Sequence, residues 1–94
     1  MPINSKETTV TADGNTTVDW NGKLGAFLAS GTFDGATAKL QHKVGSAWVD
    51  LGSDVTLTSA GGGQFITPQS ELRVNVASAG ASTSITFAVK PLVV

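Results

Sequence analysis

Apolar and polar residues alternate along most of this chain, and a turn signal interrupts the alternation about every eight to twelve residues. Residues 72–76 and 85–89 are the clearest examples, because every second residue in them is apolar. No stretch has the i, i+3, i+4, i+7 apolar spacing of an amphipathic helix. The pattern predicts an all-β fold: a small antiparallel β-sandwich or jelly roll of about eight short strands.

The length of 94 residues is that of one small domain. We therefore expect a single β-sandwich domain spanning residues 1–94. Residues 1–7 do not follow the alternation and are predicted to form a flexible N-terminal arm. Pro91 is expected to end the last strand, which would leave residues 91–94 as an apolar C-terminal tail.

Two dipeptides between strand-like segments are typical of two-residue hairpin turns. Asp34-Gly35 separates residues 26–33 from residues 36–43, and a hairpin there would place Phe27 opposite His42. Gly45-Ser46 predicts a second hairpin, in which His42 pairs with Val49. The predicted core consists of the inward apolar residues of all strands: Val10, Val18, Phe27, Phe33, Leu40, Val49, Leu51, Val55, Leu57, Phe65, Leu72, Val74, Val76, Ile85, Phe87 and Val89.

The composition argues against several classes of protein. Only 14% of the residues are charged and the formal net charge is −1, so a basic surface for nucleic acid or a polybasic membrane anchor is not expected. The absence of cysteine excludes disulfides and thiol chemistry. No apolar run approaches the roughly 18 residues of a membrane span, and the first dozen residues lack the apolar centre of a signal peptide. We therefore expect synthesis in a cytoplasm.

Candidate catalytic groups are few. His42 is the only imidazole, and the sequence gives it no nucleophile or carboxylate partner, which favours a structural histidine. Asp13, Asp34 and Asp54 fall where turns are expected, and neither Asp13-Gly14-Asn15 nor the pair formed by Asp50 and Asp54 fits a calcium-loop pattern. We expect no enzyme activity, no metal and no cofactor.

Scattered apolar residues outside the core favour a protein that buries surface against neighbours. Two of these apolar residues, Leu28 and Trp48, interrupt the otherwise polar outer face that is predicted for the Asp34-Gly35 hairpin and the strand after it. With the apolar tail they give five candidate interface residues: Leu28, Trp48, Leu92, Val93 and Val94. Exposed tryptophans also stack on sugar rings in many carbohydrate-binding β-sandwiches, so a glycan site at Trp48 is an alternative.

Residues 27–87 contain a series of short motifs. They are Gly-Thr-Phe-Asp-Gly-Ala-Thr at 31–37, Leu-Gln at 40–41, Trp-Val-Asp-Leu-Gly at 48–52, Pro68, and Leu-Arg at 72–73. With these motifs the chain resembles small β-rich virion structural proteins of tailed bacteriophages. The turn after Leu-Gln is shorter here than in many of those proteins. The motifs consist mainly of turn and strand residues, so they specify a fold better than a function.

The resemblance implies a non-enzymatic virion component, best described as a capsid decoration (cement) protein that stabilises contacts between capsomers. Its implied partners are the major capsid protein and further copies of itself, with a homotrimer favoured. The implied location is the capsid surface, after synthesis in the cytoplasm of the host bacterium. A tail, neck or fibre component, or a carbohydrate-binding module on the particle, is the alternative.

Overall fold

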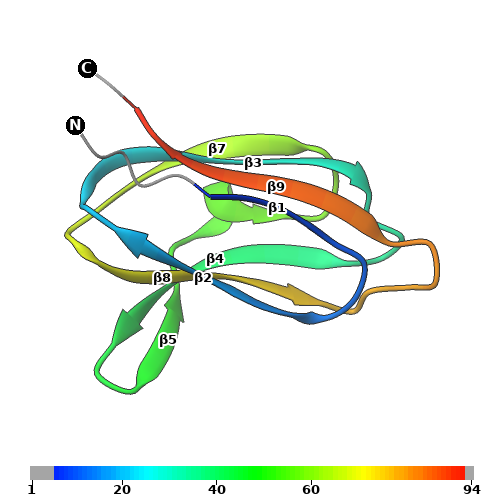
Figure 1. The fold of residues 1–94 in the computed structure, drawn as a ribbon, viewed down its shortest axis with the longest axis horizontal. Coiled ribbons are helices and arrows are strands. Elements are labelled where there is room, and N and C mark those ends of the chain that lie inside the picture. Colours follow the sequence, from blue (N-terminus) through cyan, green and yellow to red (C-terminus); the bar gives the residue numbers. More distant parts are fainter. Residues whose placement is uncertain (1–5, 93–94) are drawn as a thin grey trace.

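A computed structural model describes residues 6–92 of the chain (Figure 1). These residues form nine strands and one short 3-10 helix, and every strand pairing among them is antiparallel. The elements are β1 (Lys6–Val10), β2 (Gly14–Trp20), β3 (Lys23–Thr32), β4 (Thr37–Val44), β5 (Ala47–Asp50), η1 (Ser53–Val55), β6 (Thr56–Leu57), β7 (Gly61–Thr67), β8 (Ser70–Ala77) and β9 (Ser84–Pro91). The predicted all-β class is confirmed.

The strands form two sheets, seen as an upper and a lower layer in Figure 1. Sheet A has the order β1-β9-β3-β7. Sheet B has the order β2-β8-β4-β5, and β6 pairs with another part of β4. The chain passes from one sheet to the other at most of its connections, so strands that are adjacent in sequence mostly lie in different layers.

The pairing is that of one long hairpin ribbon that has been rolled up. β1 pairs with β9, β2 with β8, β3 with β7, and β4 with β5 and β6. The tip of the ribbon is the Gly45-Ser46 turn between β4 and β5. Ladders between β3 and β9 and between β4 and β8 then join the coils of the ribbon into sheets. This arrangement is a jelly roll.

The core lies between the two sheets and is built from the residues that alternation directs inward. The Phe27 and Phe87 rings lie 6.3 Å apart at its centre, and Trp20 packs on Phe65 with ring centroids 5.0 Å apart. Trp20 was not among the predicted core residues, yet it is only 2% exposed. Gly25 leaves room for this pair, because a Cβ there would lie 2.6 Å from each ring.

The predicted hairpin at Asp34-Gly35 is wrong, although its turn is present. Asp34 and Gly35 both have positive φ, 48° and 87°, and the Ala36 N–H donates to the Phe33 carbonyl at 2.9 Å. The strands on either side do not pair, because β3 belongs to sheet A and β4 to sheet B. The turn carries the chain from one layer to the other.

A loop from the other end of the chain holds this crossing turn in place. The buried Thr83 hydroxyl donates to the Phe33 carbonyl at 2.8 Å, and the Asp34 carboxylate accepts the Ser82 N–H at 2.9 Å. Gly80 lies so close to Asp34 that a Cβ at this position would overlap the carboxylate. Residues far away in the sequence make these contacts, so the local Asp-Gly turn signal could not predict that the flanking strands would separate.

The second predicted hairpin, at Gly45-Ser46, is confirmed. His42 pairs with Val49 in the β4–β5 ladder, and the Leu51 N–H donates to the Leu40 carbonyl at 3.1 Å. The hairpin extends sheet B beyond the rest of the sandwich (Figure 1), and Val49 on it is 48% exposed. Its assignment to the core is therefore wrong.

The first and last described residues lie near each other, because β1 pairs with the end of β9. Lys6 and Glu7 were predicted to lie in a flexible arm spanning residues 1–7, but they belong to β1, where they pair with Val89 and Ala88. Leu92 continues past β9, and its N–H donates to the Leu24 carbonyl at 3.0 Å. The rest of the predicted arm, residues 1–5, and the tail residues 93–94 lie outside the described residues.

Candidate interaction surfaces

The outward-facing side of sheet A, which we call the sheet A face, carries a group of apolar residues on β3 and β7 beside threonine and serine side chains of β1, β3 and β9. On β3, alternation buries Phe27 and directs Leu28 outward, where it is 46% exposed. Ile66 on β7 pairs with Leu24 on β3 and is 75% exposed. The apolar residues of this face are Leu24, Ala26, Leu28, Ile66 and Ala88, and Leu92 adjoins them through its backbone bond to Leu24.

The cross-strand neighbours of Leu28 on the sheet A face are small residues, so the Leu28 side chain projects above them. Gly62 is its cross-strand partner on β7, and the Leu28 side chain occupies the space where a Cβ on Gly62 would lie. Ala88 is its partner on β9. A single ion pair, Glu7 with Lys90 at 3.8 Å, lies near the β1 edge. Leu28 and Ile66 are thus left as the projecting side chains of an almost uncharged surface.

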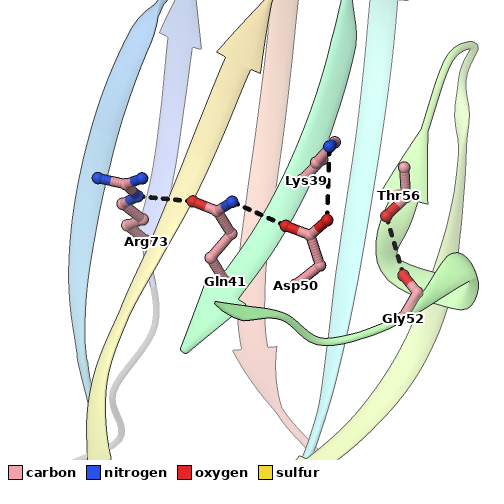
Figure 2. Close-up of polar contacts among 6 residues, drawn as sticks. All are labelled: Lys39, Gln41, Asp50, Gly52, Thr56 and Arg73. Carbon is pink, nitrogen blue, oxygen red and sulfur yellow. Dashed lines mark hydrogen bonds and ion pairs between the residues drawn. The ribbon is translucent and has the colours of Figure 1, made fainter. Parts of the chain in front are cut away.

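The outward-facing side of sheet B, the sheet B face, has a different character. A chain of polar side chains crosses three of its strands (Figure 2). Arg73 Nε donates to Gln41 Oε1 at 2.6 Å, and Gln41 Nε2 donates to Asp50 Oδ1 at 2.7 Å. Lys39 Nζ reaches Asp50 Oδ2 at 3.4 Å. Each side chain is therefore held by its neighbour.

Trp48 lies on this polar face and is partly covered by two cations. The guanidinium carbon of Arg73 is 4.5 Å from the centre of the indole ring, and Lys43 Nζ is 5.9 Å away. Lys43 also forms an ion pair with Glu71 at 3.5 Å. These cation–π contacts explain why Trp48 is only half-exposed on a surface strand.

The network also stabilises the charged form of Asp50. The hydrogen bond from Gln41 is the main cause that lowers the pKa of the Asp50 carboxyl below its usual value. Desolvation opposes this shift, and the nearby Lys39 ammonium acts in the same direction as Gln41. Asp50 therefore remains ionised on this face over a wider acidic range than an isolated aspartate.

The five predicted interface residues do not form one surface. Leu28 lies on the sheet A face and Leu92 adjoins it, whereas Trp48 lies on the sheet B face. Val93 and Val94 lie outside the described residues. The expectation that Leu28 and Trp48 share a face is wrong, because it depended on the Asp34-Gly35 hairpin. Sequence reasoning also missed Ile66, although the inward position of Phe65 was a signal that Ile66 points outward.

His42 lies on the inward side of β4, opposite Leu72 and Val49 instead of Phe27. Both of its ring nitrogens are buried, and neither has a hydrogen-bond partner among residues 6–92. The same is true of Trp20 Nε1. Since no acid, base or nucleophile of the described residues contacts the imidazole through a hydrogen bond, its arrangement fits a packing role.

Two of the three aspartates predicted to lie in turns, Asp13 and Asp34, connect loops through hydrogen bonds. Asp13 Oδ1 accepts the Ala79 N–H at 2.7 Å, and Asp34 accepts the Ser82 N–H. Both carboxylates thus fix the 78–83 loop at one end of the sandwich. Residues 6–92 contain no group of three or more His, Asp or Glu side chains placed to share a metal ion.

A cavity of about 420 Å³ opens beside the end of β7. It lies between the segment that contains η1 and the edge of sheet A, and it is lined by Leu51, Gly52, Ser53, Asp54, Val55, Gln64, Phe65 and Ile66. Its lining includes one carboxylate, Asp54, and no histidine, lysine or arginine.

Comparisons with protein-family models, curated proteins and solved structures gave no match to this chain. Over the described part of the chain, no helix has the length and apolar character needed to cross a membrane.

Proposed function

We propose that this chain is a non-enzymatic structural protein of a phage virion, and specifically a decoration protein that binds the outer shell through the sheet A face. The observation that carries the proposal is the pair of projecting residues on that face, Ile66 at 75% and Leu28 at 46% exposure, on a surface with few charges. Large apolar side chains grouped in this way are typical of surfaces that bind other proteins. The family resemblance supplies the shell as the partner.

The chemistry of the two faces supports this orientation. Docking by the sheet A face would bury apolar side chains and remove few charges from water, which is the favourable direction of transfer. The sheet B face, with its ion pairs and its hydrogen-bonded side chains, would remain in solvent. Because a shell offers many equivalent sites, each contact can be modest if several copies are linked.

A tail, neck or fibre component would use the same surface on another part of the particle. The carbohydrate-binding alternative depends on Trp48, but the guanidinium of Arg73 already covers part of the indole ring. A sugar ring would need to displace Arg73 or use the opposite side of the indole, so we favour the protein-binding role.

The test is co-sedimentation of the purified protein with empty heads, and separately with tails, of the phage whose genome encodes it. The proposal expects saturable binding to heads and an increase in the temperature or osmotic shock that the heads survive. Binding to tails alone would assign the chain to the tail. Binding to neither structure, together with retention on a glycan array that is lost in Trp48→Ala, would replace the proposal with the carbohydrate-binding alternative.

A further inference from the structure

Sheet A ends at β7, and this edge is open. Within residues 6–92, β7 has a backbone ladder only with β3, so the opposite side of the strand has no ladder partner. The nearby η1 segment contacts β7 at Gly63, where the Asp54 carbonyl occupies the position that a Cβ would take. The cavity lined by Gln64 and Ile66 lies beside the same edge.

The β7 edge also lacks the features that usually prevent edge strands from pairing. Natural proteins protect such edges with charged residues, proline, bulges or very short strands. Among the other edge strands, β1 carries Lys6 and Glu7, β2 carries Asp19, and β5 has four residues and carries Asp50. β6 has only two residues. β7 has seven residues, Gly-Gly-Gly-Gln-Phe-Ile-Thr, with no charge and no proline.

We propose that β7 is a self-association edge, at which the β7 strands of two copies of this chain pair antiparallel about a two-fold axis. The two A sheets would then form one continuous sheet of eight strands. A second copy fits this edge on grounds of charge: identical strands face each other in such a pair, and β7 brings no like charges together. The pairing closes after two copies, whereas the family resemblance implies a trimer.

The register of the pair follows from the length of the strand. Full overlap of two β7 strands places Gln64 opposite Gln64 on the axis, and Ile66 of each copy opposite Gly62 of the other. Leu28 lies over Gly62 within each copy. The exposed Ile66 of one copy would therefore pack beside Leu28 of the other, on the same side of the continuous sheet.

The two-fold axis also determines on which side of the dimer each sheet A face lies. A two-fold axis perpendicular to a sheet reverses the strand direction but keeps the same face on the same side. Both sheet A faces would thus lie on one side of the dimer and form one double-sized surface. The inference goes beyond the proposed function and does not rest on it, since pairing at β7 needs no shell.

The first experiment uses a single introduced cysteine, because the chain has none of its own. Opposite residues of an antiparallel pair have Cα atoms about 4.5–5.5 Å apart, within the range that a disulfide spans. Gln64→Cys under mild oxidation is expected to form a cross-linked dimer in high yield. The matched control is Thr17→Cys, also exposed and on an edge strand, which is expected to remain largely uncrosslinked.

The second experiment is a charge exchange measured by light scattering. Gln64→Lys and Gln64→Glu each place two like charges opposite each other on the axis, so each is expected to weaken dimerisation about ten-fold or more. An equimolar mixture of the two variants is expected to restore the dimer. Gln64 is exposed, so thermal unfolding should confirm that each variant keeps its fold.

A wild-type dimer with cross-linking at position 64 and rescue in the mixture would establish the edge. A monomer or a trimer, equal cross-linking of both cysteine variants, or no effect of charge at position 64 would overturn it. These measurements use the isolated protein. A dimer that does not bind heads would refute only the shell-binding function, and a monomer that binds heads would refute only the β7 pairing.

Discussion

The two outer faces of the sandwich have the same strand geometry and opposite chemistry. On the sheet B face, Arg73, Gln41, Asp50 and Lys39 form a continuous chain of polar contacts, and Trp48 is covered by cations. On the sheet A face, Ile66 projects into solvent. The exposed large apolar side chains of the described residues lie in two places: Leu28 and Ile66 on the sheet A face, and Val44 and Val49 on the projecting β4–β5 hairpin. Of these two places, we assign binding to the sheet A face.

The largest expected effect is on binding to the shell. The double substitution Leu28→Lys with Ile66→Lys should lower affinity for heads about 100-fold, because it replaces two side chains that would each contribute about 1.5–3 kcal/mol when fully buried. Sedimentation with heads measures the loss. The free energy of unfolding should change by no more than about 1 kcal/mol, since both residues are partly or largely exposed.

The control for that variant is Ser46→Lys, which adds a charge at the tip of the β4–β5 hairpin, away from the sheet A face. It should bind heads as the wild type does. If it lost binding as strongly as the double variant, the hairpin tip would be the docking site and the contrast between the two faces would have no functional meaning.

A smaller effect is expected at Trp48. Trp48→Ala removes the indole that lies under Arg73 and should lower the free energy of unfolding by about 1–2 kcal/mol, through lost burial and lost cation–π contact. Urea denaturation followed by circular dichroism measures the change. Binding to heads should remain intact, and a loss of binding in a folded variant would place the shell contact on the sheet B face.

Gln41 should have a somewhat smaller effect on stability. Gln41→Ala removes the hydrogen bonds to both Arg73 and Asp50, which we expect to cost about 1 kcal/mol. Because the chain of contacts includes exposed charges, added salt should reduce the difference between variant and wild type. A difference that is independent of salt would show that the polar contacts contribute little and that packing of the Gln41 side chain causes the loss.

The smallest effect is the pH dependence due to Asp50. Its pKa is lower in the folded chain than in the unfolded chain, so its contribution to stability is complete above the unfolded value and is lost as the pH falls through the folded value. Asp50 is well exposed, so this contribution should be below about 1 kcal/mol. Asp50→Asn should therefore be less stable than wild type at pH 7, and the difference should shrink as the pH falls below the ordinary pKa of an aspartate, about 3.9. A difference that stays the same over this range would mean that ionisation of Asp50 does not contribute.

Much of the fold could be predicted from strand alternation. Phe27, Leu40 and Val74 point inward as their spacing indicated, and the Gly45-Ser46 hairpin has the predicted register. The error at Asp34-Gly35 has a physical origin: a two-residue turn does not determine whether its flanking strands pair. Contacts to Thr83 and Ser82, about 50 residues away, direct those strands into different sheets.

The candidate surface was harder to predict than the fold. Leu28 was identified from the sequence, but the assignment of Trp48 to the same face depended on the incorrect hairpin. Ile66 was missed although Phe65 had been assigned to the core, because the alternating segment that contains both residues is short and follows three glycines. The open edge at β7 could not be recognised without the order of the strands, since sheet position depends on pairings that span most of the chain.

The most direct test is a cryo-electron microscopy reconstruction of empty heads incubated with the purified protein. We expect added density on the outside of the shell that fits the sandwich with β3, β7 and β9 towards the capsid and the Trp48 side exposed. Density with the sheet B face against the shell would contradict the assignment of the two faces. Heads that carry no added density at a saturating protein concentration would contradict the decoration role.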